Sequence, residues 1–87
     1  MEFEWDERKS RANKSKHRID FNTAIKLWND QDRIEIQTNF PAENRNALIE
    51  KSGDKLWTAI LTRRVDAIRI ISVRRARKKE TKLYEQK

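Results

Sequence analysis

The most apolar segment of the chain, residues 67–73 with the sequence AIRIISV, limits the possible folds more than any other feature. A near-continuous apolar run rich in β-branched side chains is typical of a central strand. A chain of 87 residues buries roughly 60–65% of its unfolded surface, which is enough for one core. We therefore predict one domain over residues 1–87, built around a sheet that contains this strand.

Strand patterns before this segment predict that the sheet is antiparallel. Residues 33–38 alternate polar and apolar side chains, as a half-buried strand does. Residues 46–51 and 56–63 flank the turn sequence Ser52-Gly53-Asp54, and a turn at Arg64-Val65 leads into the apolar segment. These strands form a meander, and the alternating start MEFEW adds one short strand. We expect an antiparallel sheet of about four to five strands.

Helices are predicted on either side of the meander in the sequence, which makes the fold α+β. The first runs from a cap at Asp6 to about Lys16 and lies on the surface, with Ala12 and the stems of Lys9 and Lys16 facing inward. The second begins near Asp20 and carries the strongest apolar stripe of the chain, at i, i+3, i+4 and i+7: Phe21, Ala24, Ile25 and Trp28. A third helix is expected in the C-terminal segment, residues 74–87.

The charge of the chain predicts a polyanionic partner. Lys and Arg total 21 and Asp and Glu total 14, so the formal net charge is +7. Residues 74–87 carry seven cations and two acids, and residues 8–18 carry six cations and no acid. Such a basic balance favours nucleic acid as the partner. Because only 36% of the residues are apolar, the domain should also gain stability from a protein partner that covers its surface.

Several classes of site are excluded by residue type. The chain has no cysteine, which removes disulfides, thiolate metal sites and cysteine nucleophiles and fits a reducing compartment, the cytoplasm. One histidine and scattered acids form no metal-ligand spacing, and one glycine is too few for a phosphate-binding glycine loop. No apolar run approaches the ~18 residues of a membrane span, and no secretory signal is recognisable. We expect no cofactor, no metal and no membrane partner.

The only histidine, His17, stands between Lys16 and Arg18 at the predicted end of the first helix. In that position an imidazole can stabilise exposed carbonyls and the helix dipole by about 0.3–1 kcal/mol, and this structural role is the more common one. In a cationic groove, a neutral imidazole could instead accept the proton of a ribose 2′-hydroxyl. Residue type alone leaves both roles open.

Four arginines bracket the last two predicted strands: Arg63, Arg64, Arg69 and Arg74. An arginine inside a strand, such as Arg69, either faces water or pairs with a carboxylate, and the structural pair is the commoner case. Guanidinium groups that converge on one sheet face would also suit a phosphate whose charge grows in a pentacoordinate state. The arginines are therefore candidates for phosphate binding.

The basic C-terminal segment begins with RRARKK and includes Arg75, Arg77 and Lys78. Such a run is commonly a solvated helix face or a localisation signal. Its functional use would be sequence-independent contact with the RNA backbone. Tyr84 lies on the apolar side of the same predicted helix and is expected to be a core anchor with its hydroxyl at the rim, rather than a catalyst. The tryptophans, Trp5, Trp28 and Trp57, are expected in the core.

Two series of residues, each in the expected order and region, resemble the BrnT toxins. The N-terminal series is Phe3, Glu4, Trp5, Asp6, Lys9, Asn13, Lys16, His17, Phe21 and Ala24. The C-terminal series is Ile68, Arg69, Ile70, Ile71, Ser72, Arg74, Ala76, Glu80 and Tyr84. The resemblance spans nearly the whole chain. BrnT toxins are small ribonucleases of type II toxin–antitoxin pairs with a fold similar to that of RelE toxins.

The resemblance implies a metal-independent endoribonuclease that acts in the cytoplasm, cleaves RNA and inhibits translation. It implies neutralisation by a BrnA-like antitoxin, a ribbon-helix-helix dimer that holds two toxin chains and binds operator DNA. By matching motif positions, the active-site candidates are Lys16, His17, Arg69 and Arg74. Arg63 is a weaker candidate, and we assign it to RNA binding together with Arg64, Arg75, Arg77 and Lys78.

The sequence departs from the BrnT pattern in two places. Arg18 stands where family members usually have a glycine after the histidine. The connection of residues 39–45 contains Pro41 but lacks the tyrosine and glycine often found there. A preference for an RNA sequence is therefore not transferred. The competing functions are a noncatalytic basic protein that binds nucleic acid, either as a transcriptional regulator or in association with the ribosome.

Overall fold

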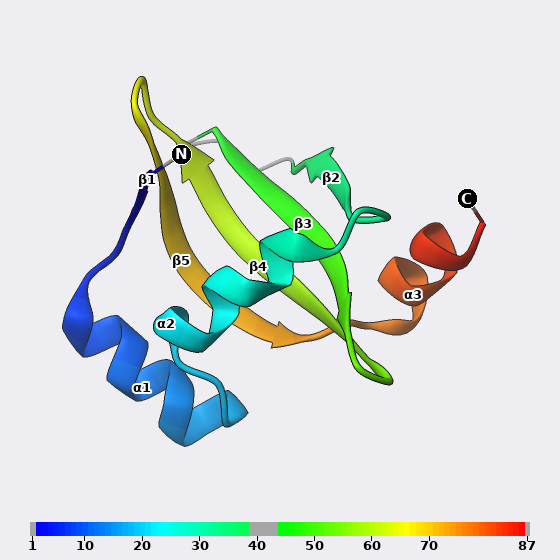
Figure 1. Cartoon of the computed structure of the whole chain (residues 1–87), viewed down its shortest axis with the longest axis horizontal. Coiled ribbons are helices and arrows are strands. Elements are labelled where there is room, and N and C mark those ends of the chain that lie inside the picture. The colour runs from blue at the N-terminus through cyan, green and yellow to red at the C-terminus, as the bar shows by residue number, and fades with distance from the viewer. Residues whose placement is uncertain (1, 39–43, 87) are drawn as a thin grey trace.

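The computed structural model describes residues 2–38 and 44–86, which form a sheet flanked by helices (Figure 1). The strands are β1 (Glu2–Glu4), β2 (Ile34–Gln37), β3 (Arg45–Ser52), β4 (Lys55–Arg63) and β5 (Ala67–Arg75). The helices are α1 (Glu7–His17), α2 (Phe21–Ala24), the 3₁₀-helix η1 (Ile25–Asn29) and α3 (Lys78–Glu85). The predicted α+β class is confirmed. Pro41 lies outside the described residues.

The strand order in the sheet is β1-β5-β4-β3-β2. Strands β2 to β5 form the predicted antiparallel meander, with Gly53 in the left-handed conformation at the β3–β4 turn. The predicted central position of the apolar segment is confirmed, because β5 lies between β1 and β4. Strand β1 pairs with β5 in parallel, with Glu4 beside Arg69. The sheet is therefore mixed at this edge.

The core lies between the sheet and the N-terminal helices, which cover one face of it (Figure 1). Phe21, Ala24 and Leu27 pack there against buried residues of the strands: Leu48, Ala59, Leu61, Ile68, Ile70 and Val73. The expected core tryptophans are partly buried against this cluster. Two aspartates cap the helices, since Asp6 accepts from the Arg8 N–H and Asp20 from the Thr23 N–H.

The prediction for the inner face of α1 is wrong. Ala12, Lys9 and Lys16 are exposed, whereas Ser10 and Asn13 are buried. Asn13 donates to the carbonyls of Ile19 and Val73 and accepts from the Val73 N–H at 3.1 Å. Strand β1 pairs with β5 only up to Arg69, so Asn13 supplies the hydrogen bonds that a longer neighbouring strand would make at Val73. Polar anchoring, rather than an apolar stripe, attaches this helix to the sheet.

The C-terminal helix begins later than predicted. Strand β5 continues to Arg75, which pairs with Trp57, and the Ala76 N–H donates to the Leu56 carbonyl. The backbone of residues 74–76 is thus occupied by the sheet. Helix α3 follows from Lys78, where the Glu80 carboxylate accepts from the Arg77 N–H at 2.7 Å.

One carboxyl group, that of Glu50 on β3, is fully buried. Neither of its oxygens has a hydrogen-bond partner among the described residues. Burial, with a smaller contribution from the nearby charge of Asp30, raises the pKa of Glu50 to about 9. Glu50 is therefore a neutral acid at pH 7.

Candidate active site

The open face of the sheet, on the side away from α2 and η1, carries two of the predicted active-site arginines. Arg69 lies opposite Thr62 and Arg74 opposite Thr58, and these threonines are four residues apart on the same face of β4. The two arginines are five positions apart in the sequence, so a regular strand would place them on opposite faces. A register shift at Ile60/Leu61 adds one residue to β5 and brings both arginines to the same face.

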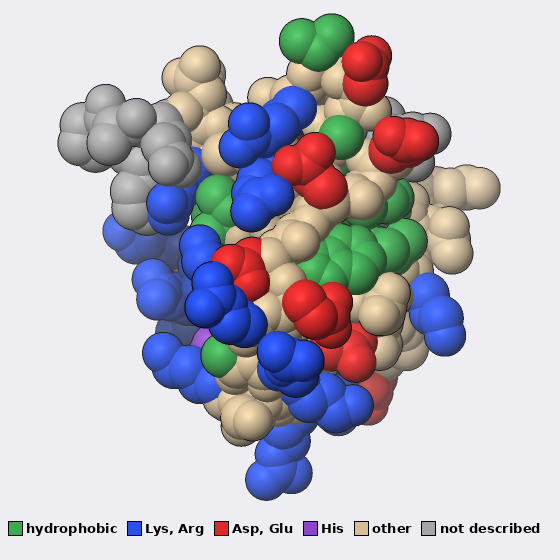
Figure 2. All heavy atoms as spheres, turned by 90° about the vertical axis from the view of Figure 1, so that its left-hand side faces the viewer, with side chains coloured by type: hydrophobic (Ala, Val, Ile, Leu, Met, Phe, Trp, Pro, Cys, Tyr) green, Lys and Arg blue, Asp and Glu red, His purple; other side chains and the backbone are tan. Residues whose placement is uncertain are grey.

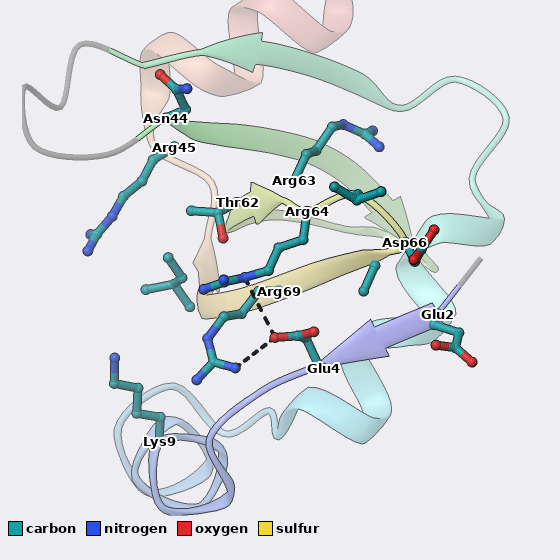
Figure 3. Close-up of a pocket in the computed structure, with 13 residues that line it drawn as sticks. Glu2, Glu4, Lys9, Asn44, Arg45, Thr62, Arg63, Arg64, Asp66 and Arg69 are labelled. Atoms are coloured by element: carbon teal, nitrogen blue, oxygen red, sulfur yellow. Dashed lines mark hydrogen bonds and ion pairs between the residues drawn. The ribbon is translucent and has the colours of Figure 1, made fainter.

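A pocket of about 860 Å³ opens at one end of this face, beside β1 and the β4–β5 turn. Lys9, Arg45, Arg64 and Arg69 point toward the same space in it (Figure 3). They come from α1, β3, the β4–β5 turn and β5. The carboxylate of Glu4 lies among them, 3.0 Å from Arg69 Nη1 and 3.7 Å from Arg64 Nε. The structure thus gathers cations that are up to 60 residues apart in the sequence.

Arg63 also borders this pocket but points away from it, toward β2 (Figure 3). Its side chain donates two hydrogen bonds to Glu35, which also accepts from Asn46 Nδ2 at 2.6 Å. The bond with Arg63 is the main cause of the lowered pKa of Glu35. Arg63 therefore ties β4 to β2 and is already engaged in a bidentate ion pair.

Arg74 makes a second bidentate pair at the other end of the open face. Its Nη1 and Nη2 donate to the two oxygens of Glu80 at 2.8 and 2.9 Å. Glu80 Oε1 also accepts from Thr58 Oγ1 at 2.9 Å, which joins α3 to β4 and β5. These contacts, led by the bond from Arg74, lower the pKa of Glu80 to about 2. Arg74 therefore has a structural partner, and its catalytic role stays a prediction.

Lys16 and His17 lie at the C-terminal end of α1, which Asn13 anchors to β5 at Val73. Lys16 is exposed and His17 is half-buried, and neither makes an ion pair within the part of the chain that the structure describes. Lys9 on the same helix reaches the pocket at Arg69, so α1 runs alongside β5 from the pocket toward Arg74. Figure 2 shows the histidine among basic side chains that gather along one side of the molecule.

Arg18 closes α1 with a positive φ of 65°, and its N–H donates to the Lys14 carbonyl. This left-handed conformation favours glycine, because a Cβ makes it costly for other residues. The geometry accounts for the glycine that we expected at this position from the resemblance. Arg18 keeps the same helix end at a conformational cost.

The basic residues of the C-terminal segment do not share one position. Arg75 stacks over the Trp57 ring at 5.5 Å, and Arg77 and Lys78 are exposed where α3 begins. Tyr84 donates its hydroxyl to Asp30 Oδ2 at 2.8 Å. Burial and Asp30 raise the pKa of Tyr84 to about 12, so its expected role as an anchor, not a catalyst, fits this contact.

A comparison with protein families identifies the family of the chain. The profile described as "Ribonuclease toxin, BrnT, of type II toxin-antitoxin system" matches residues 5–80. The chain belongs to the BrnT family. A search of curated protein sequences found no match. Membership makes this BrnT chain a ribonuclease toxin, for which RNA is the substrate and an antitoxin is the partner.

Among the pocket residues of this BrnT chain that sequence reasoning did not predict are three charged residues that lie with Arg64 and Arg69: Glu4, Lys9 and Arg45. Glu4 and Lys9 were both part of the family resemblance, but Glu4 was given no role and Lys9 was expected to cover the core with its stem. Arg45 precedes the predicted strand by one residue, and only the pairing of Arg45 with Thr62 reveals that it shares a face with Arg69. No pattern in the sequence predicts that Glu4 pairs with residues 60 positions later.

Metal and membrane sites find no support in the described residues of this BrnT chain. No group of three or more His, Cys, Asp or Glu side chains within residues 2–38 and 44–86 could hold a metal ion. None of the helices there is long and apolar enough to cross a membrane.

Proposed function

We propose that this BrnT toxin cleaves RNA without a metal ion on the open face of the sheet, along β5. The observation that carries the proposal is the convergence of Lys9, Arg45, Arg64 and Arg69 on one pocket. Lys9 and the Lys16–His17 pair belong to the same helix, so a strand of RNA bound at the pocket can continue toward His17. A basic groove that follows the backbone is the usual site for single-stranded nucleic acid.

The reaction that suits these side chains is an internal transfer of the phosphate. The ribose 2′-oxygen attacks the adjacent phosphorus, the bond to the 5′-oxygen breaks, and a 2′,3′-cyclic phosphate remains. His17 or Lys16 accepts the proton of the 2′-hydroxyl, and arginine stabilises the charge on the pentacoordinate phosphorus. Arg69 is easier to release for this role than Arg74, because its partner Glu4 is more exposed than Glu80.

The leaving 5′-oxygen needs a proton, for which His17, a lysine and Tyr84 were the candidates. The hydroxyl of Tyr84 binds Asp30, which also accepts from the Lys51 N–H. Lys51 lies six residues along β3 from Arg45, or roughly 20 Å at the rise of a strand. The Tyr84 hydroxyl is therefore at the opposite end of β3 from the pocket. His17 or a lysine is therefore the proposed acid.

The partner that we propose is a BrnA-like antitoxin that covers the same open face. A basic domain gains stability, and loses access to RNA, when an acidic or amphipathic partner covers its cations. We further propose two toxin chains on one ribbon-helix-helix antitoxin dimer, with operator DNA bound by the antitoxin. In this scheme the free toxin acts in the cytoplasm and inhibits translation.

Incubation of the purified chain with RNA in EDTA tests the cleavage proposal. We expect fragments that end in a 2′,3′-cyclic phosphate, with equal rates in EDTA and in Mg²⁺. A strict requirement for a divalent ion would contradict metal independence. Binding of RNA without cleavage would favour the alternative of a noncatalytic nucleic-acid-binding protein.

Co-purification with the adjacent gene product, followed by sizing and an RNase assay of the complex, tests the proposal that an antitoxin binds and inhibits the toxin.

A further inference from the structure

Glu4 occupies the position in the pocket where an anion would bind. A single carboxylate oxygen, Oε2, lies 3.0 Å from Arg69 Nη1 and 3.7 Å from Arg64 Nε. The parallel pairing of β1 with β5 places Glu4 beside Arg69, and the Arg64 N–H donates to Ala67 to close the turn that carries Arg64. An oxygen held between two guanidinium groups has the same surroundings as a phosphate oxygen in an arginine site.

The contacts of Glu4 are weak enough to exchange. The side chains of Glu4, Arg64 and Arg69 are 42%, 58% and 33% exposed. Ion pairs with this exposure contribute about 0–1 kcal/mol. Each guanidinium group has five N–H donors, so both arginines keep donors for an incoming anion while Glu4 is in place. Replacement of the carboxylate by a phosphate therefore costs little.

The other charges around Glu4 favour an anion of higher charge than a carboxylate. Lys9 and Arg45 point toward the same space, whereas Glu2 and Asp66 lie on the far side of the pocket (Figure 3). Glu4 is thus the acid nearest to the converging cations. If its side chain turns away, the donors with which Arg64 and Arg69 hold Glu4 become available to an incoming anion.

From this geometry we infer that the pocket binds a backbone phosphate of the RNA, and that Glu4 is a built-in competitor for that phosphate. RNA displaces the carboxylate from Arg64 and Arg69 as it binds. The identity of the ligand as RNA rests on the proposed function. Glu4 is a positioning residue, because it acts through the two arginines and lowers the affinity of the free toxin for RNA.

Fluorescence anisotropy with a labelled 2′-O-methyl RNA tests this inference, because that RNA binds but cannot be cleaved. Glu4→Gln should lower the Kd by about three- to tenfold at fixed salt, since the competitor is removed. Glu2→Gln is the matched control, with the same change in charge on the same strand and in the same pocket, and should change the Kd by less than twofold. Thermal unfolding of both variants checks that the fold is retained.

A double-mutant cycle then separates competition from a change in net charge. Arg69→Ala should raise the Kd by about tenfold, and Glu4→Gln should no longer tighten binding when Arg64 and Arg69 are both alanine. Equal gains from Glu2→Gln and Glu4→Gln, or a gain that persists without the two arginines, would overturn the inference. Displacement of the RNA by poly-glutamate at a lower concentration than by unlabelled RNA would assign the pocket to an acidic protein partner instead.

The outcome for the pocket is distinguishable from the outcome for catalysis. If the wild-type chain binds 2′-O-methyl RNA with the expected response to Glu4→Gln but does not cleave ordinary RNA, the cleavage proposal fails and the phosphate site stands. If ordinary RNA is cleaved but Glu4→Gln leaves the Kd unchanged, the phosphate site fails alone.

Discussion

Each end of the open sheet face has an ion pair between an arginine and a glutamate, but the two pairs differ in geometry and exposure. At the pocket, Arg69 and Glu4 form a single-oxygen contact between side chains that are 33% and 42% exposed. At the α3 end, Arg74 and Glu80 form a bidentate pair between side chains that are 19% and 14% exposed, and Thr58 joins them. The first pair is exposed and is the one that we propose to open for a phosphate, whereas the second holds α3 on the sheet. An arginine in a family motif therefore has a role that depends on its carboxylate.

A third carboxyl group shows that the partner, and not burial alone, makes this difference. Glu50 is fully buried and Glu80 is mostly buried. Hydrogen bonds from Arg74, Arg77 and Thr58 lower the pKa of Glu80, whereas Glu50 has no hydrogen-bond partner among the described residues and its pKa is raised. Ionisation of Glu80 stabilises the fold, and ionisation of Glu50 opposes it.

The largest expected effect concerns Glu50. Its pKa rises from 4.5 to about 9 on folding, so its contribution to stability is complete below pH 4.5 and is lost as the pH rises toward 9. Glu50→Gln should remove this dependence and stabilise the protein at pH 9 by several kcal/mol relative to the wild type. Urea unfolding at pH 5, 7 and 9 measures it. Asp54→Asn, in the exposed turn, is the control that should leave the dependence intact. If the free energy of unfolding of the wild type does not change between pH 5 and pH 9, the pKa of Glu50 is not raised by burial.

The next effect tests whether the Arg74 end is structural. The pKa of Glu80 falls from 4.5 to about 2, so its stabilisation is present above pH 4.5 and is lost as the pH falls toward 2. Arg74→Ala should lower the free energy of unfolding at pH 7 by about 3 kcal/mol and flatten the acid part of the profile. Urea unfolding at pH 3 and pH 7 measures both. If Arg74→Ala keeps wild-type stability but loses RNA cleavage, Arg74 is an active-site residue and the assignment of a structural role to its pair with Glu80 is wrong.

The pocket end should show the opposite behaviour. Arg69→Ala at the pocket, and His17→Ala at the C-terminal end of α1, should each lower the rate of RNA cleavage by more than tenfold, roughly 1.4 kcal/mol or more of transition-state stabilisation. Because the Arg69–Glu4 pair is exposed, Arg69→Ala should change the free energy of unfolding by less than about 1 kcal/mol. Single-turnover cleavage and urea unfolding of the same preparations provide the two numbers. Wild-type rates in both variants would place the active site elsewhere.

The smallest effect concerns the end of α1, which carries Lys16 and His17. Arg18→Gly should stabilise the fold by about 0.5–1 kcal/mol, because glycine adopts the left-handed conformation without the cost that Arg18 bears. Thermal unfolding detects a change of this size. Arg18→Ala is the matched control, since it removes the same charge but keeps the Cβ, and it should not stabilise. A loss of stability in Arg18→Gly would mean that the arginine side chain holds the helix end.

Interactions between residues close together in the sequence determined most of the secondary structure of this protein. The alternating strand segments, Gly53 at the hairpin, the caps at Asp6 and Asp20 and the apolar stripe from Phe21 all act between near neighbours in the chain. They predict the strands and helices of the α+β fold, the meander and the central place of residues 67–73. The residues that resemble BrnT toxins are also read directly from the sequence, and the match over residues 5–80 confirms the family.

The tertiary structure alone decided which charges meet. Alternation along a regular strand would separate Arg69 from Arg74, and one additional residue in β5 places them on the same face. The parallel pairing of β1 with β5 brings Glu4 to arginines 60 and 65 positions later. Burial keeps the carboxyl group of Glu50 neutral. Glu80 instead forms an ion pair with Arg74. These outcomes depend on strand register and on surrounding side chains distant in sequence, and no local pattern contains that information.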